Sequence, residues 1–158
     1  MSLTAEAEKN TDCSTPYCGN AQVVVVPAGN ESLYQSEDSL KGLSFIAEKD
    51  SSSQEAVLAL GLTCDSAETQ LQALEAVSAG EYDACVVDLV LANAVTGSGN
   101  RFPALTVTMA LTYEEYAAGF RKGSDLKTAF DEFYIKAVSD GTVAALAETY
   151  GLSGQIIG

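Results

Sequence analysis

Polar side chains recur in this sequence where apolar, strand-like segments end. They are Ser51, Ser52 and Ser53, then Asp65, and then Asp88. Serine hydroxyls and the backbone N–H groups at a helix start can donate to a carboxylate, whereas a fixed aspartate accepts from an ammonium group. The three serines and Asp88 therefore have the chemistry to hold the two ends of a zwitterion.

Helix capping is the alternative role for the same residues. Serine and aspartate are preferred at N-cap positions, and Asp65 followed by Glu68 has the spacing of a capping box. Asp65 and Asp88 are also candidates for a carboxylate pair, but their spacing does not fix the distance between them. The residue types leave capping and ligand binding both open.

The elements that must position these residues alternate along the chain. The four successive valines of 23–26 predict a strand that is buried on both faces. The sequence predicts strands at 21–27, 43–48, 62–64, 82–87, 104–110 and 116–121, a loop at 28–38, and helices at 54–60, 65–79, 89–95, 124–139 and 142–150. Alternation of this kind predicts an α/β fold with a mostly parallel sheet flanked by helices. Ligands of such sheets bind beyond the carboxyl ends of the strands.

Charge and composition exclude several classes of function. The chain has 22 acidic and 8 basic residues, a formal net charge of −14, which disfavours binding to nucleic acid or to an anionic membrane. It contains no histidine, so a histidine-based catalytic triad is excluded. No phosphate-binding or nucleophile-elbow motif is present. We therefore expect neither an enzyme nor a cofactor.

The cysteines and the first residues of the chain add three expectations. Cys13, Cys18, Cys64 and Cys85 form no C-x-x-C pair, so no zinc site is expected. We expect free thiols, with Cys85 buried in its apolar run. The alternative is a disulfide between Cys13 and Cys18 in an oxidising compartment. No run of 18 apolar residues spans a bilayer, and residues 1–10 lack the basic and apolar regions of a signal peptide.

Five segments in order resemble the polar-amino-acid-binding proteins of ABC transporters, solute-binding protein family 3. They are D-C-S-T-P-Y at 12–17, the strand 21–26, L-K-G at 40–42 with the serines at 51–53, A-G-E-Y-D-A at 79–84 with Asp88, and F-R-K-G at 120–123 with D-G-T at 140–142. The order of the segments over nearly the whole chain carries the resemblance, because no single motif is specific.

The resemblance implies a type II periplasmic-binding-protein fold, in which two lobes clamp a free polar amino acid. Residues 22–109 would form the second lobe, and 1–21 and 110–158 would belong to the first lobe. The chain would then be truncated, without most of the first lobe. The implied partner is the membrane permease of the transporter. The implied location is extracytoplasmic, in the periplasm or as a cell-surface lipoprotein.

The resemblance also assigns roles to individual residues. Asp88 matches the aspartate that holds the ligand ammonium, and Ser51 and Ser52 match hydroxyl residues that meet its carboxylate. Ser2 matches a hydroxyl position of the first lobe. Ser53 joins this set as the third serine of the helix start.

Two positions depart from the family pattern. The carboxylate-binding arginine of the family falls on Ala7, and the glycine before the hydroxyl pair falls on Asp50, whose charge would repel a ligand carboxylate. Losing such an arginine would cost ~2–5 kcal/mol of binding free energy if it were buried and paired. The alternative function is a stand-alone α/β interaction module, or a degenerate remnant that binds no ligand. In the family the two C-terminal helices pack on the lobe that is missing here, so they would fold back on the second lobe or pair between chains as a homodimer.

Overall fold

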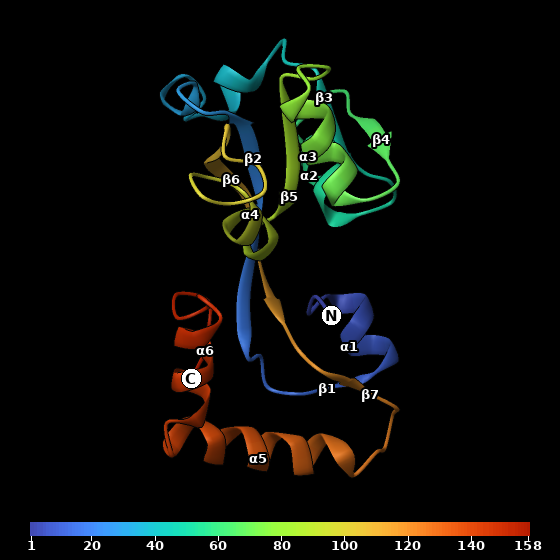
Figure 1. Cartoon of the computed structure of the whole chain (residues 1–158). Coiled ribbons are helices and arrows are strands. Elements are labelled where there is room, and N and C mark those ends of the chain that lie inside the picture. The colour runs from blue at the N-terminus through green and yellow to red at the C-terminus, as the bar shows by residue number, and fades with distance from the viewer. The chain divides into compact units, whose positions relative to one another are not determined.

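The computed structural model describes residues 1–158 as two compact units. Unit 1 comprises Met1–Asn20 and Glu114–Gly158, and unit 2 comprises Ala21–Tyr113. The chain enters unit 2 through β2 (Cys18–Pro27) and leaves it through β6 (Leu105–Tyr116) (Figure 1). Unit 2 is therefore a single continuous segment, whereas unit 1 is built from both ends of the chain.

Unit 2 contains a five-stranded sheet in the order β4-β3-β5-β2-β6. Strand β3 (Phe45–Glu48) pairs in parallel with both β4 (Asp65–Ala67) and β5 (Ala84–Asp88). Helices connect these strands, as parallel neighbours require. Strand β2 runs antiparallel to β5. The predicted α/β class is confirmed, and the sheet is mixed.

The valine run explains how the sheet buries both faces. Successive side chains of a strand point to opposite faces. Val23 and Val25 pack into the cluster that α3 (Gln70–Ser78) and α4 (Leu89–Val95) cover, whereas Val24 and Val26 pack with Val57 of α2 (Ser52–Ala59). A different set of helices therefore shields each face of β2 from water.

The segment between β2 and β3 differs from the predicted loop. It contains two short 3-10 helices, Glu31–Leu33 and Glu37–Leu40, and the second buries Leu40 against the α2 side of the sheet. Helix α2 begins two residues before the predicted start at 54. Its N-cap is Ser51, whose hydroxyl oxygen accepts from the Gln54 backbone N–H at 3.3 Å.

The prediction around Asp65 is wrong. The sequence pattern predicts a strand at 62–64 with Asp65 capping the next helix, but Asp65 is the first residue of β4, paired with Ile46 of β3. Thr69 caps α3 instead, accepting from the Gln72 N–H at 3.2 Å. Strand pairing with β3 takes up residues 65–67, and threonine four positions later is also a good cap.

Unit 1 contains three helices and two short strands from the two ends of the chain. Helix α1 (Ala5–Asn10) precedes β1 (Asp12–Cys13), which pairs antiparallel with β7 (Gly119–Phe120). Helices α5 (Leu126–Ser139) and α6 (Thr142–Thr149) follow, close to their predicted ranges. The predicted strands at 104–110 and 116–121 are instead one long strand, β6, and the short β7.

An aromatic cluster holds α5 in unit 1. Phe130 stacks on Tyr134 with ring centroids 6.3 Å apart, and Tyr17 meets both rings edge-on. The Tyr134 hydroxyl donates to the carbonyls of Tyr17 and Ile157 at 3.0 and 2.7 Å. Five large apolar side chains of α5, α6 and the residue after α6 are nevertheless exposed: Leu126, Phe133, Ile135, Leu146 and Tyr150.

Asp50 is strained, and its replacement is expected to stabilise the protein. Its φ of 56° is the only positive value at a residue other than glycine. A left-handed conformation costs an L residue ~1–2 kcal/mol, and the added flexibility of glycine returns ~0.5–1 kcal/mol of that. We expect Asp50→Gly to raise the free energy of unfolding by about 0.5–1 kcal/mol. Thermal unfolding measures this, and Lys49→Gly, at a position without positive φ, should lower it.

The thiols of unit 2 are expected to be inert near neutral pH. Burial raises the pKa of Cys85 to about 12, and burial together with the Asp65 carboxylate raises that of Cys64 to about 11. The thiolate is the reactive form, so these raised pKa values keep both thiols unreactive. The stability gained by burying the neutral thiols is lost only as pH rises from 9 toward the two raised pKa values. N-ethylmaleimide at pH 8 should label both residues only after unfolding, and rapid labelling of folded protein at Cys85 would contradict this.

Candidate functional site

Asp88 lies at the carboxyl end of β5, as predicted, but its side chain does not cap the following helix. It occupies the N-cap position of α4 without a side-chain capping bond. Its Oδ1 accepts from Gln22 Nε2 at 2.8 Å, and its Oδ2 accepts from Gln70 Nε2 at 2.7 Å. The Asp88 backbone N–H in turn donates to Gln70 Oε1 at 2.9 Å. The half-buried carboxylate is thus held by one amide on each oxygen.

Strand register explains why Gln22 meets Asp88. The two residues are directly paired across β2 and β5, where Val24 and Val86 are paired two positions further along and belong to the same core cluster. Residues two apart share a face of a strand. The polar pair therefore continues a row of apolar pairs to the point where β5 ends.

Ser53 extends this group of side chains to α2. It is 1% exposed, and its hydroxyl donates to Gln22 Oε1. Ser53, Gln22, Asp88 and Gln70, here called the Asp88 network, thereby join the starts of α2 and α3 to strands β2 and β5. A buried polar group needs such partners, because leaving one unsatisfied costs ~1–3 kcal/mol.

The other two serines differ in their surroundings. The Ser51 hydroxyl acts as the α2 cap and also donates to the Glu48 carbonyl at 2.6 Å. Ser52 is the first residue of α2 and is exposed. Both lie beyond the carboxyl end of β3, the parallel neighbour of β5.

Two further predicted positions lie in unit 1. Ser2 forms an isolated antiparallel bridge with Tyr116. Ala7 is buried within α1, where its N–H donates to Thr4 Oγ1 at 3.1 Å. An alanine methyl group supplies no hydrogen bond to a carboxylate.

Asp65 does not join the Asp88 network. It opens β4 rather than following it, and its exposed carboxylate accepts from the Tyr82 hydroxyl at 2.8 Å. The residue that reaches Asp88 from this part of the chain is Gln70, because it follows the carboxyl end of β4. Because Asp65 was predicted to cap this helix, Gln70 fell in the helix interior and was not predicted to reach Asp88.

Gln22 carried a weak signal in the sequence. It directly precedes four valines that are buried on both faces. A polar residue in such a strand needs a buried partner, but the partner depends on the register with β5. No local pattern gives that register.

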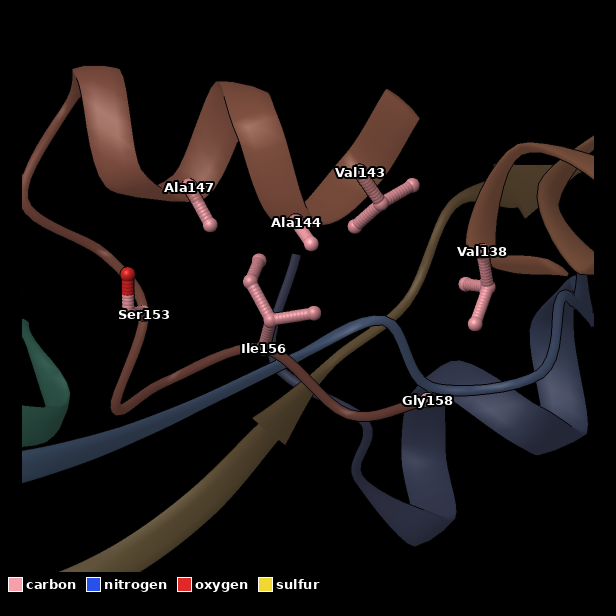
Figure 2. Close-up of a pocket in the computed structure, with 7 residues that line it drawn as sticks. All are labelled: Val138, Val143, Ala144, Ala147, Ser153, Ile156 and Gly158. Atoms are coloured by element: carbon pink, nitrogen blue, oxygen red, sulfur yellow. The ribbon is translucent and has the colours of Figure 1, made fainter. Parts of the chain in front are cut away.

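Two pockets lie within unit 1. One, of about 240 Å³, is lined by α5, α6 and the C-terminal segment, where Ile156 points toward Ala144 and Ser153 supplies the polar side chain among mainly aliphatic ones (Figure 2). The other, of about 400 Å³, is lined by Asp12 and Lys122, whose charges pair at 3.3 Å.

The structure contains no cluster of three or more histidine, cysteine, aspartate or glutamate side chains able to hold a metal ion. None of its helices combines the length and the apolar character needed to cross a bilayer. All four cysteines are free thiols, and Cys85 is buried, as predicted.

Solved structures similar to this chain share its fold. ArtJ from Geobacillus stearothermophilus, an arginine-, lysine- and histidine-binding protein, is 26% identical with a TM-score of 0.79, covering 95% of this chain and 66% of its own. A putative ABC-transporter binding component from Wolinella succinogenes, complexed with lysine, is 22% identical with a TM-score of 0.84, covering 94% and 66%. An ancestral amino-acid-binding protein, a precursor of cyclohexadienyl dehydratase, is 24% identical with a TM-score of 0.81, covering 95% and 66%.

This chain therefore spans about 66% of the length of these solved chains. No curated protein matches the sequence. The model of one protein family, the bacterial extracellular solute-binding proteins, family 3, matches residues 1–153. The type II periplasmic-binding-protein fold expected from the resemblance is confirmed by these neighbours. The chain belongs to the bacterial extracellular solute-binding proteins of family 3.

Proposed function

We propose that this chain is the solute-binding component of an ABC transporter and binds a free polar amino acid outside the cytoplasm. Unit 2 would be the second lobe of the receptor, and unit 1 would be part of the first. Asp88 would accept the α-ammonium group of the ligand, and Ser51, Ser52 and Ser2 would contribute to its carboxylate side. The membrane permease of the transporter would be the partner.

The arrangement of Asp88 is the observation that carries this proposal. A residue at an N-cap position ordinarily uses its side chain to cap the helix, but Asp88 does not. Its carboxylate is held by two neutral amides at the carboxyl end of a strand, where ligands of α/β sheets bind. A carboxylate has about four acceptor positions, so it can accept from an ammonium group as well as from amides.

Charge favours a cationic amino acid as the ligand. In unit 2, twelve acidic residues outnumber three basic ones, Lys41, Lys49 and Arg101, and a negative field attracts cations. The similarity to ArtJ, described as binding arginine, lysine and histidine, supports the same choice. Ala7 stands where the family has its carboxylate-binding arginine, and Asp50 would repel the ligand carboxylate. Both weaken binding of the carboxylate, so we expect modest affinity.

A role without catalysis is part of the proposal. The family model describes solute-binding proteins, and the Asp88 network contains no nucleophile with an adjacent base. The similarity to a dehydratase precursor is the reason to test turnover directly.

The five exposed apolar side chains of α5, α6 and the residue after α6 support the further prediction of a homodimer through these helices.

Calorimetric titration of the protein with arginine, lysine, histidine and glutamine tests the function. We expect saturable binding of at least one cationic amino acid. The Nα-acetyl derivative of that ligand should not bind, since acetylation removes the ammonium charge that Asp88 would accept. Equal binding of the two forms would contradict the role of Asp88, and no heat with any free amino acid up to millimolar concentration would overturn the function.

A further inference from the structure

We infer that Gln22 and Gln70 are positioning residues that orient the Asp88 carboxylate toward the ligand ammonium, with Ser53 fixing the amide of Gln22. The inference rests on the proposed function of Asp88. It adds Gln22 and Gln70, which were not among the predicted site residues, and it assigns Ser53 a role other than direct contact with the ligand.

The direction of each hydrogen bond follows from the chemistry of the groups. An ionised carboxylate only accepts, so the amide nitrogens of Gln22 and Gln70 face Asp88. The amide oxygen of Gln22 must then face Ser53, whose hydroxyl donates to it. The hydrogen bonds of the network therefore have one consistent set of donors and acceptors, from the buried Ser53 hydroxyl to the Asp88 carboxylate.

Gln70 holds both the side chain and the main chain of Asp88. Its nitrogen donates to Oδ2 while its oxygen accepts from the Asp88 N–H. Because Gln70 is the first residue of α3, this two-point contact ties the carboxylate to the start of a helix. Gln22, which is 2% exposed, fixes the other oxygen from β2.

Fixing a side chain before binding lowers the entropy cost of complex formation. Because an amide donates to each oxygen, rotation of the carboxylate plane would break both bonds. Ser53 is 1% exposed and acts on the ligand only through Gln22, so it supports the geometry of Asp88.

The test uses Gln70→Met, which keeps the length and helix propensity of the residue but removes the amide. Gln72→Met, on the exposed side of the same helix, is the matched control. Gln70→Met removes a hydrogen bond to a charged group, which is among the stronger hydrogen bonds in proteins. We therefore expect it to weaken binding of the cationic amino acid about tenfold or more. Gln72→Met should bind as the wild type does.

A second readout separates positioning from general damage to the fold. The carboxyl-carbon NMR resonance of Asp88, assigned by its loss in Asp88→Asn, should shift in Gln70→Met and stay in place in Gln72→Met. If Gln70→Met does not fold, Gln70→Glu replaces it, since it keeps the acceptor for the Asp88 N–H and should weaken binding further by placing a like charge beside Asp88.

Each outcome decides the inference. Weaker binding with a shifted Asp88 resonance supports it. Unchanged binding, or weaker binding with an unmoved resonance, overturns the positioning role while leaving the proposed function intact. Failure of the wild-type protein to bind any amino acid overturns the proposed function and the positioning role with it.

Discussion

Asp88→Asn is expected to reduce amino-acid binding by at least about 30-fold while changing the stability of the protein only slightly. A hydrogen-bonded charge pair at a binding site costs ~2–5 kcal/mol when one partner is removed, and asparagine keeps the size of aspartate but not its charge. The ligand ammonium would lose its counter-charge and would meet an amide instead.

The fold should survive because the Asp88 network can reverse the hydrogen bonds on one side. Asparagine at this position can keep its oxygen toward Gln70 Nε2 and turn its amide nitrogen toward Gln22. The Gln22 amide then flips, so that its oxygen accepts from the new asparagine and its nitrogen donates to Ser53. A serine hydroxyl can accept as well as donate, so each side chain of the network keeps a hydrogen-bond partner.

Calorimetric titration and thermal unfolding of the same preparations measure both effects. Asp83→Asn is the matched control, because Asp83 lies just before β5 and its exposed carboxylate accepts from the Ser44 hydroxyl and N–H at 2.6 and 2.8 Å. Those bonds lower the pKa of Asp83, so its replacement should affect stability slightly and binding not at all. An Asp88→Asn protein that binds within about threefold of the wild type would show that the ammonium does not depend on this charge.

The sequence was sufficient to predict those features that depend on local pattern. The valines at 23–26 predicted a strand buried on both faces, and the apolar run ending in Asp88 predicted a strand end followed by α4 at 89–95, whose range agrees with the structure. Both signals lie within a few residues of one another. Hydrophobic burial determines each of them without reference to distant partners.

The remaining features depend on register between distant strands. Asp65 and Thr69 are both suitable caps, and only the pairing of β4 with β3 decides between them. That decision moves Gln70 from the interior of a predicted helix to its first position. The pairing of Gln22 with Asp88 spans 66 residues of sequence, so it cannot be found from the spacing of either residue with its neighbours.

Gln22→Leu is expected to lower the free energy of unfolding by about 2–4 kcal/mol, because the substitution affects two hydrogen bonds at once. Ser53, 1% exposed, would lose the acceptor of its hydroxyl, at ~1–3 kcal/mol, and Asp88 would lose a donor to a charged oxygen, at ~1.5–3 kcal/mol. Leucine fits the apolar row that Val24 continues, and its burial offsets part of this cost.

The double variant Gln22→Leu with Ser53→Ala shows whether these losses are coupled. Removing the serine hydroxyl from the Gln22→Leu protein should recover about 1–2 kcal/mol, since no unsatisfied donor remains, whereas Ser53→Ala alone should destabilise the protein by leaving Gln22 Oε1 without the hydroxyl. Urea unfolding of the four proteins measures this cycle. Strictly additive effects would mean that Ser53 and Gln22 do not support each other. If Ser53→Ala instead destabilises the wild type but stabilises the Gln22→Leu protein, the two residues support each other. The buried hydroxyl is then the fixed end of the network that holds Asp88.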